Sequence, residues 1–195
     1  MSLSLADCSD GELAALALAG RQAAYRELLA RHREAVFRLV RATIGEPAEA
    51  IDVTQEAFIS AFAALTRYDP ERPFIAWLKR IALNKCRDWA RRRTVRSFFT
   101  RAVPLEDALS IADDAALADT QAADRAELAR VSAAITRLPA RLREVLLLRA
   151  VDGLSQAEAA DTLGVTEKAV ETRLYRARAK LEEMLGPRNH ADEQF

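Results

Sequence analysis

The sequence is poor in the residues that build metal centres, disulfides and catalytic dyads. Only two of its 195 residues are cysteines, Cys8 and Cys86, and only two are histidines, His32 and His190. The cysteines lie far apart and lack a CxxC partner, so we expect two reduced thiols. Neither a metal-ligand cluster nor a nucleophile–base pair accompanies the histidines. The sequence therefore predicts no metal, no cofactor and no enzymatic activity.

Long apolar runs and net charge are also missing. The first residues, MSLSLADCSDGELAAL, have no basic region ahead of their apolar positions, and no run of about 18 uncharged apolar residues follows. We therefore expect no signal peptide, no membrane insertion and a cytoplasmic protein. The 29 Lys and Arg balance 29 Asp and Glu, which argues against non-specific coating of a polyanion unless the charges are segregated.

What is abundant is Ala, Leu, Arg and Glu, with only six glycines and six prolines, and this composition predicts an all-α fold. Apolar spacings of three and four residues predict a helix over 10–43 with a break at Gly20. In the next helix Ile51, Phe58, Phe62 and Leu65 are predicted to form the core face. The loop RYDPERP then leads into FIAWLKRIALNKCRDWARRR, an aromatic helix rich in Lys and Arg.

An acidic stretch of small residues, 97–124, separates two parts of the chain and contains Pro104. We interpret it as a flexible linker with a transient helical turn near 113–123. The predicted organisation is a first helical domain at 1–96, the linker at 97–124, a second helical domain at 125–186 and a tail at 187–195. Leu138-Pro139 predicts a helix end and restart inside the second domain. The charges are thus segregated: basic helices on either side of an acidic middle.

The stretch GLSQAEAADTLGVTEKAVETRLYRARAKL predicts a helix-turn-helix. Ser155 with Glu158 forms a capping box, Gly164 suits the left-handed turn residue, and Thr166 caps the last helix. In this plan the second helix enters the major groove of DNA. The residues left outside its apolar stripe to meet bases and phosphates are Thr166, Lys168, Glu171, Thr172, Arg173, Tyr175, Arg176 and Arg178.

This segment from Leu138 to Leu181 resembles the fourth domain of bacterial RNA polymerase sigma factors, specifically the small extracytoplasmic-function (ECF) group. The first domain is similar to the second domain of the same family. IDVTQEAFISAFAAL matches a D-x-x-Q-E-x-F pattern, and FIAWLKRIALNKCRDWARRR matches a W-L-x-x-I-A-x-N-x-x-x-D-x-x-R pattern. The two matches stand in the family's order and cover about three-quarters of the chain.

The resemblance implies an alternative sigma factor that binds core RNA polymerase and directs promoter-specific initiation. Asp52, Gln55 and Glu56 would dock on the clamp helices of the largest subunit, and the chain would also meet the flap of the second largest. Recognition and melting of the −10 promoter element would use residues of the loop and the basic helix, namely Tyr68, Asp69, Arg72, Lys79, Arg80, Asn84, Lys85, Arg87, Asp88, Arg91 and Arg92. The helix-turn-helix would read the −35 element. An anti-sigma factor is a further expected partner.

The linker suits this assignment. At ~3.3 Å per residue, residues 97–124 span at most roughly 90 Å, and promoter elements two helical turns apart are ~70 Å apart. Its acids (Glu106, Asp107, Asp113, Asp114 and Asp119) either imitate nucleic-acid charge or form a solvated tether. Two other functions are weaker. A sigma-mimicking regulator would add a receiver domain, and an autonomous repressor would need a dimer interface or a ligand pocket.

Glu171 departs from the Arg or Lys common in the family, and it generates a prediction. A carboxylate accepts a hydrogen bond from the cytosine amine, or orients Arg173 or Tyr175. We expect Glu171→Arg to change which upstream element is preferred, as measured by selection from a random pool of duplex DNA. An unchanged preference would make Glu171 an ordinary surface residue.

Overall fold

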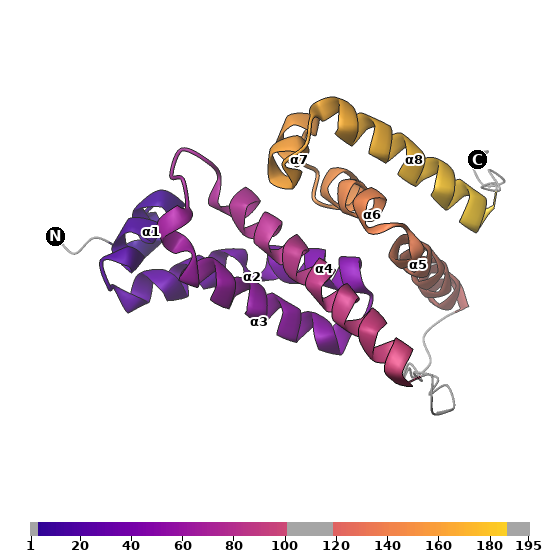
Figure 1. The fold of residues 1–195 in the computed structure, drawn as a ribbon, viewed down its shortest axis with the longest axis horizontal. Helices are drawn as coiled ribbons and strands as arrows, with labels where there is room; N and C mark the ends of the chain where they lie inside the picture. The colour runs from indigo at the N-terminus through magenta and orange to yellow at the C-terminus, as the bar shows by residue number, and fades with distance from the viewer. Residues whose placement is uncertain (1–3, 101–118, 187–195) are drawn as a thin grey trace.

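The computed structural model describes residues 4–100 and 119–186, which form helices and contain no strand. The N-terminal domain comprises a 3-10 turn (Leu5–Asp7) and helices α1 (Asp10–Leu18), α2 (Gln22–Ile44), α3 (Pro47–Ala63) and α4 (Phe74–Thr100), with a second 3-10 turn at Leu65–Arg67. The C-terminal domain comprises α5 (Asp119–Arg137), α6 (Ala140–Leu146), a π-helical turn (Leu147–Val151), α7 (Gln156–Leu163) and α8 (Glu167–Leu185). Figure 1 shows α6, α7 and α8 lying along one side of α4. The all-α fold is confirmed.

The helix boundaries predicted from glycine and proline are confirmed, while the linker is shorter than its predicted range. Gly20 (φ +89°) separates α1 from α2, and Gly45 (φ +76°) ends α2. Pro139 is the N-cap of α6. However, α4 continues to Thr100 and α5 begins at Asp119, so helix extends into both ends of 97–124. The linker acids and the turn predicted near 113–123 fall largely outside the described residues.

The N-terminal domain has a single apolar core between α1, α2, α3 and α4. Leu13, Leu28, Phe58, Phe74 and Leu78 are at most 4% exposed within it. Tertiary packing of these faces holds the helices, because burying one such side chain contributes about 1.5–3 kcal/mol. The prediction that Ile51 belongs to this core is wrong. Its side chain is 52% exposed, and the smaller Ala50, Val53 and Ala57 line the core instead.

Arg31 ties the start of the chain to this domain. Its guanidinium donates to the carbonyl oxygens of Leu5, Ala6 and Cys8 at 3.0, 2.8 and 2.7 Å. His32 lies 2.8 Å from Asp10 through Nε2. One arginine thus binds three carbonyls of the 3-10 turn and the residue that follows it, which positions the start of the chain against α2.

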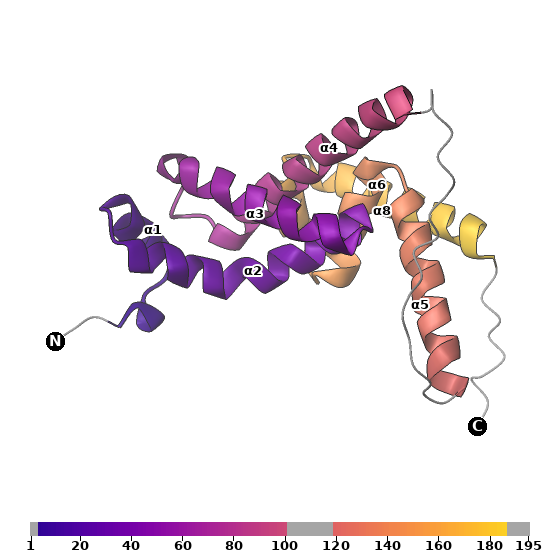
Figure 2. The same cartoon turned by 90° about the horizontal axis from the view of Figure 1, so that it is seen from below.

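The C-terminal domain packs α6 and α7 against α8. Val145, Leu148, Ala159 and Val170 are fully buried at their contact, and Ala177 is buried farther along α8. Figure 2 shows α5 projecting from this group, and α4 extending beyond α3 at its C-terminal end. Two residues of the N-terminal domain, Leu39 and Leu83, belong to the same apolar cluster, so the two domains share buried surface.

The capping box of α7 gives the first stability prediction. Ser155 Oγ accepts from the Glu158 amide at 3.2 Å, and the Glu158 carboxylate accepts from the Ser155 amide at 2.7 Å. Ser155→Ala should lower the unfolding free energy by about 1 kcal/mol, measured by urea denaturation. Ser132→Ala, inside α5, is the matched control and should change it by less than about 0.5 kcal/mol. Equal effects of the two substitutions would show that the cap contributes nothing.

Candidate nucleic-acid interface

The helix-turn-helix forms with the predicted local geometry. Gly164 adopts φ +65° between α7 and α8, a left-handed conformation that favours glycine. Thr166 Oγ1 then accepts from the Ala169 amide at 3.2 Å and caps α8. Val170 and Ala177 are buried, while Ala169, Leu174 and Leu181 are half-buried. The predicted inner stripe therefore faces the domain, and the opposite face of α8 is free.

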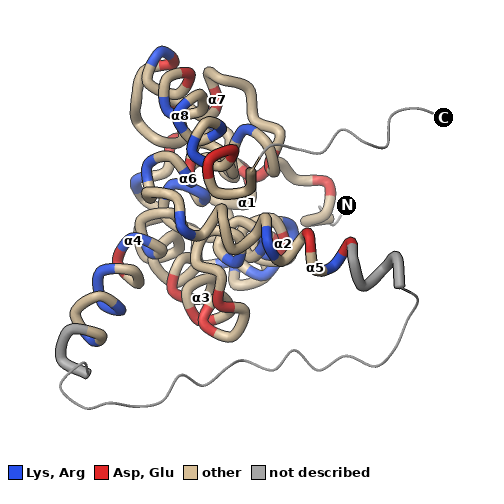
Figure 3. Tube along the Cα trace, turned by 90° about the vertical axis from the view of Figure 1, so that its right-hand side faces the viewer, with Lys and Arg blue, Asp and Glu red and all other residues tan. Residues whose placement is uncertain are grey.

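Seven of the eight residues predicted to contact the −35 element are exposed along α8 and its cap, and Arg173 is half-buried. Tyr175 is the most exposed large hydrophobic side chain of the described residues, with 76% of its surface exposed. Figure 3 shows the Lys and Arg positions following α8 and α4, with acidic positions on α3. A row of exposed basic side chains with an aromatic residue is expected of a helix that contacts DNA phosphates and the edges of nucleobases.

The partner of Glu171 is Lys168. Lys168 Nζ lies 2.9 Å from Glu171 Oε2, and neither Arg173 nor Tyr175 is hydrogen-bonded to this carboxylate in the described structure. Both side chains are exposed, at 80% and 56%, so the pair is worth at most about 1 kcal/mol. Glu171 is therefore neutralised in the free protein, and breaking the pair to meet DNA costs little.

The residues predicted to contact the −10 element lie in three places. Tyr68 and Asp69 are in the loop before α4, where Tyr68 Oη donates to the Arg72 carbonyl at 2.7 Å and its ring packs against Phe74 and Trp77. Trp77 is half-buried against the core. The C-terminal domain is contacted by four basic residues of the loop and of the first half of α4, namely Arg72, Lys79, Arg80 and Arg87. Asn84 accepts from Arg87 at 2.7 Å.

The rest of the basic helix faces α3 or solvent. Arg92 pairs with Glu56 at 3.2 Å and Arg93 with Glu46 at 2.8 Å. Asp88 pairs with Arg91, and Lys85 is half-buried. The structure thus brings the predicted −10 residues onto one helix and its preceding loop, but it leaves few of their charges unpaired.

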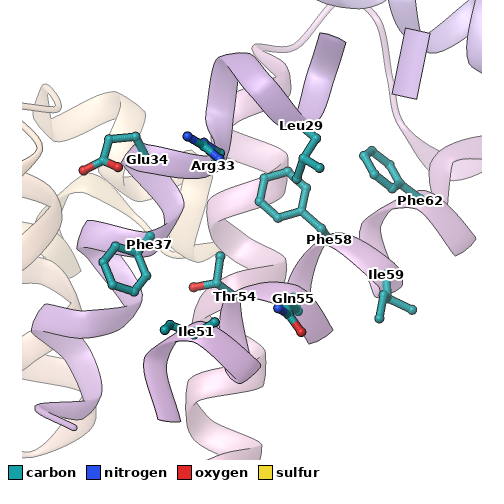
Figure 4. A pocket seen from close by; sticks show the side chains of 10 residues that line it. All are labelled: Leu29, Arg33, Glu34, Phe37, Ile51, Thr54, Gln55, Phe58, Ile59 and Phe62. Carbon is teal, nitrogen blue, oxygen red and sulfur yellow. The ribbon is translucent and has the colours of Figure 1, made fainter. Parts of the chain in front are cut away.

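The residues predicted to bind polymerase lie on the outer face of α3. Asp52 and Gln55 are exposed, and Glu56 is partly covered by its pairing with Arg92. Beside them runs an apolar groove of about 600 Å³ between α2 and α3, with Phe58 at its floor. Figure 4 shows Leu29 and Phe37 from α2 and Ile59 and Phe62 from α3 around it.

The sequence did not predict this groove. Its signal is the exposure of large apolar side chains: Ile51, Ile59 and Leu29 are 52, 68 and 39% exposed. Apolar surface gathered beside polar groups marks an interaction site. The α3 face thus combines an acidic and amide row with apolar surface.

The described residues hold no group of three metal-ligating side chains. In residues 4–100 and 119–186 no helix is long and apolar enough to cross a membrane. Both cysteines are buried free thiols.

Comparison with known proteins gives the same two-part assignment. Residues 28–112 match the family model described as Sigma-70 region 2, and residues 128–181 match Sigma-70, region 4. The chain is 45% identical over 180 residues to the RNA polymerase sigma factor CnrH of Cupriavidus metallidurans, covering 91% of this chain and 94% of the relative. It is 35% identical over 178 residues to the ECF sigma factor SigM of Mycobacterium tuberculosis, covering 91% and 85%.

A solved structure of CnrH in complex with the cytosolic domain of CnrY superimposes with a TM-score of 0.65 at 39% identity, covering 90% of this chain and 96% of that one. The chain belongs to the sigma-70 family of RNA polymerase sigma factors. Within the family it is a member of the ECF group, as its sequence motifs predicted.

The buried thiols yield a chemical prediction. Burial raises the pKa of Cys86 to about 12, so its thiol is protonated and unreactive below that pH. Cys8 is 4% exposed. At pH 8 we expect Ellman's reagent to modify neither thiol in the native chain and both in urea. Rapid release of one equivalent from native protein would contradict the structure.

Proposed function

We propose that this chain directs core RNA polymerase to promoters through three separate faces. The exposed row of Asp52 and Gln55 with the adjoining apolar groove on α3 binds the clamp helices of the largest subunit. The exposed face of α8 reads the upstream (−35) element, and α4 with its preceding loop reads and helps to melt the downstream (−10) element. The observation that carries the proposal is that both sigma regions are present and that α3 and α8 present exposed polar faces.

The chain supplies binding and positioning, and the polymerase supplies the chemistry. It acts in the cytoplasm, where the polymerase and the promoter are. The predicted linker lets the domains occupy both elements at once. This assignment is favoured over an autonomous repressor because two regions of the sigma-70 family cover most of the chain.

An anti-sigma factor is a proposed regulatory partner. CnrH, 39% identical in its solved structure, forms a complex with the cytosolic domain of CnrY. A comparable partner of this chain would control it by covering the α3 face, because that face joins an apolar groove to exposed polar groups. Competition between such a partner and core polymerase for the chain would follow.

Asp52 is the sharpest probe of the polymerase face. It is exposed, whereas Glu56 is held by Arg92, so a reversal at Glu56 would also repel a cation within the domain. Asp52→Lys should weaken binding to core polymerase by about tenfold or more, measured by fluorescence anisotropy of the labelled chain. Run-off transcription with purified core should fall in parallel.

The control is Asp124→Lys, the same charge reversal on the exposed start of α5. Its polymerase affinity should equal that of the wild type. Equal affinities for Asp52→Lys and wild type would remove Asp52 from the interface. Absence of any run-off product from a genomic library of promoters with core and wild-type chain would overturn the proposed function itself.

A further inference from the structure

The interface between the two domains lies on the basic face of α4 that we assign to the −10 element. Arg87 donates to both carboxylate oxygens of Glu144 from Nε and Nη2, at 2.6 and 2.5 Å. Lys79 Nζ lies 2.8 Å from Asp152 Oδ2, with both side chains at most 8% exposed. This contact is an ion pair whose alignment is too poor for a hydrogen bond. Two cations of the DNA face are therefore neutralised by acids of the C-terminal domain.

The end of α7 occupies two more cations. Arg72 Nη1 lies 2.8 Å from Asp161 Oδ1. Arg80 donates to the carbonyl oxygens of Asp161 and Thr162, which belong to the last turn of that helix. A helix C-terminus carries partial negative charge. Each of these four basic side chains thus contacts negative charge contributed by the C-terminal domain.

Carboxylates suit this position because they share the recognition chemistry of phosphate. An arginine fork binds either group through two parallel N–H donors, and a lysine binds either as a point charge. Glu144 is 1% exposed, and its two carboxylate oxygens accept hydrogen bonds from Nε and Nη2 of Arg87. Glu144, Asp152 and Asp161 therefore bind the cations to which the proposed function assigns promoter phosphates.

The covering is close on the apolar side as well. Leu39 and Leu83 are 2 and 1% exposed and pack with Val145 and Leu147 of the C-terminal domain. The turn of the helix-turn-helix is pressed against the same helix, since a Cβ at Gly164 would lie 3.3 Å from Arg80 Nη2. While the domains are in contact, Lys79 is covered, and the guanidinium groups of Arg80 and Arg87 are bound to groups of the C-terminal domain.

Promoter geometry makes separation of the domains necessary. Elements two helical turns apart are ~70 Å apart, whereas α4 and α7 touch through Arg72, Arg80 and Asp161. The α3 row and the outer face of α8 lie outside the contact: Asp52 and Gln55 are exposed, and Tyr175 is 76% exposed. The polymerase face is open, while four cations of the −10 face are held by groups of the C-terminal domain.

We propose that Glu144, Asp152 and Asp161 form an autoinhibitory latch that holds the −10 face of α4 shut in the free protein. The latch rests on the proposed function, because it assigns that face to DNA. Opening exchanges carboxylate for phosphate at the same cations, so promoter DNA compensates for the ion pairs that it displaces. The apolar packing of Leu39 and Leu83 against Val145 and Leu147 favours the closed form, and the ion pairs determine which cations it covers.

The test uses the full chain without polymerase, and two substitutions that remove charge from the latch. Glu144→Gln leaves the Arg87 fork without an anion, and Asp161→Asn removes the exposed pair with Arg72. Small-angle X-ray scattering measures domain separation, and fluorescence anisotropy measures binding of a labelled 20-nucleotide single-stranded DNA of mixed sequence. Glu183→Gln, an exposed carboxylate at the far end of α8, is the matched control.

We expect Glu144→Gln to raise the radius of gyration and to tighten DNA binding by about tenfold. Asp161→Asn should tighten it by about two- to threefold, and Glu183→Gln should behave as wild type. Wild-type scattering and wild-type DNA affinity in both latch variants would overturn the proposal. Asp161 is exposed, so its variant keeps the test valid if Glu144→Gln fails to fold by circular dichroism.

A charge swap separates the latch from a general loss of stability. Glu144→Arg should open the chain, and the pair Arg87→Glu with Glu144→Arg should close it again. The swapped chain should scatter as wild type yet bind DNA no more tightly, because Arg87 is gone. A swapped chain as open as Glu144→Arg would overturn the latch. Since no arm contains polymerase, failure of run-off transcription and failure of the latch are separate results.

Discussion

The structure depends on the two-sided burial of α4. One side of this helix supplies Phe74, Leu78 and Trp89 to the core of the N-terminal domain, and Leu83 joins the apolar cluster of the C-terminal domain. Between these sides lies a line of cations that burial would penalise if each lacked an anion. The pairings follow from this constraint, because the buried Lys79 ammonium requires an anion and the buried Glu144 carboxylate requires a cation.

The features that local chemistry determines could be predicted from the sequence. Ser155, Gly164 and Thr166 act on backbone groups within a few residues, so their roles are visible in a short window. The same holds for the break at Gly20 and the restart after Pro139. The exposed face of α8 follows from these caps, because they set the register at which its apolar stripe turns inward.

What the sequence could not show is non-local. Arg87 and Glu144 are 57 positions apart, and nothing near either residue announces the other. The basic residues of α4 were therefore interpreted only as DNA contacts. The error at Ile51 has the same origin, since periodicity finds an apolar face but not where the opposing helix ends. The groove on α3 exists because α2 leaves Ile51 and Ile59 uncovered.

The carboxylate of Glu144 is attached to the same chain as the guanidinium it binds. A tethered competitor acts at an effective concentration that dilution does not lower, so every DNA segment competes against the same internal standard. Apparent affinity for DNA is the intrinsic affinity multiplied by the open fraction. Random genomic sequence offers phosphates but few correct nucleobases, so its affinity is too low to displace the tethered carboxylate. The pairing of Arg87 with Glu144 thus acts as an affinity threshold, which a chain of zero net charge sets with its own acids.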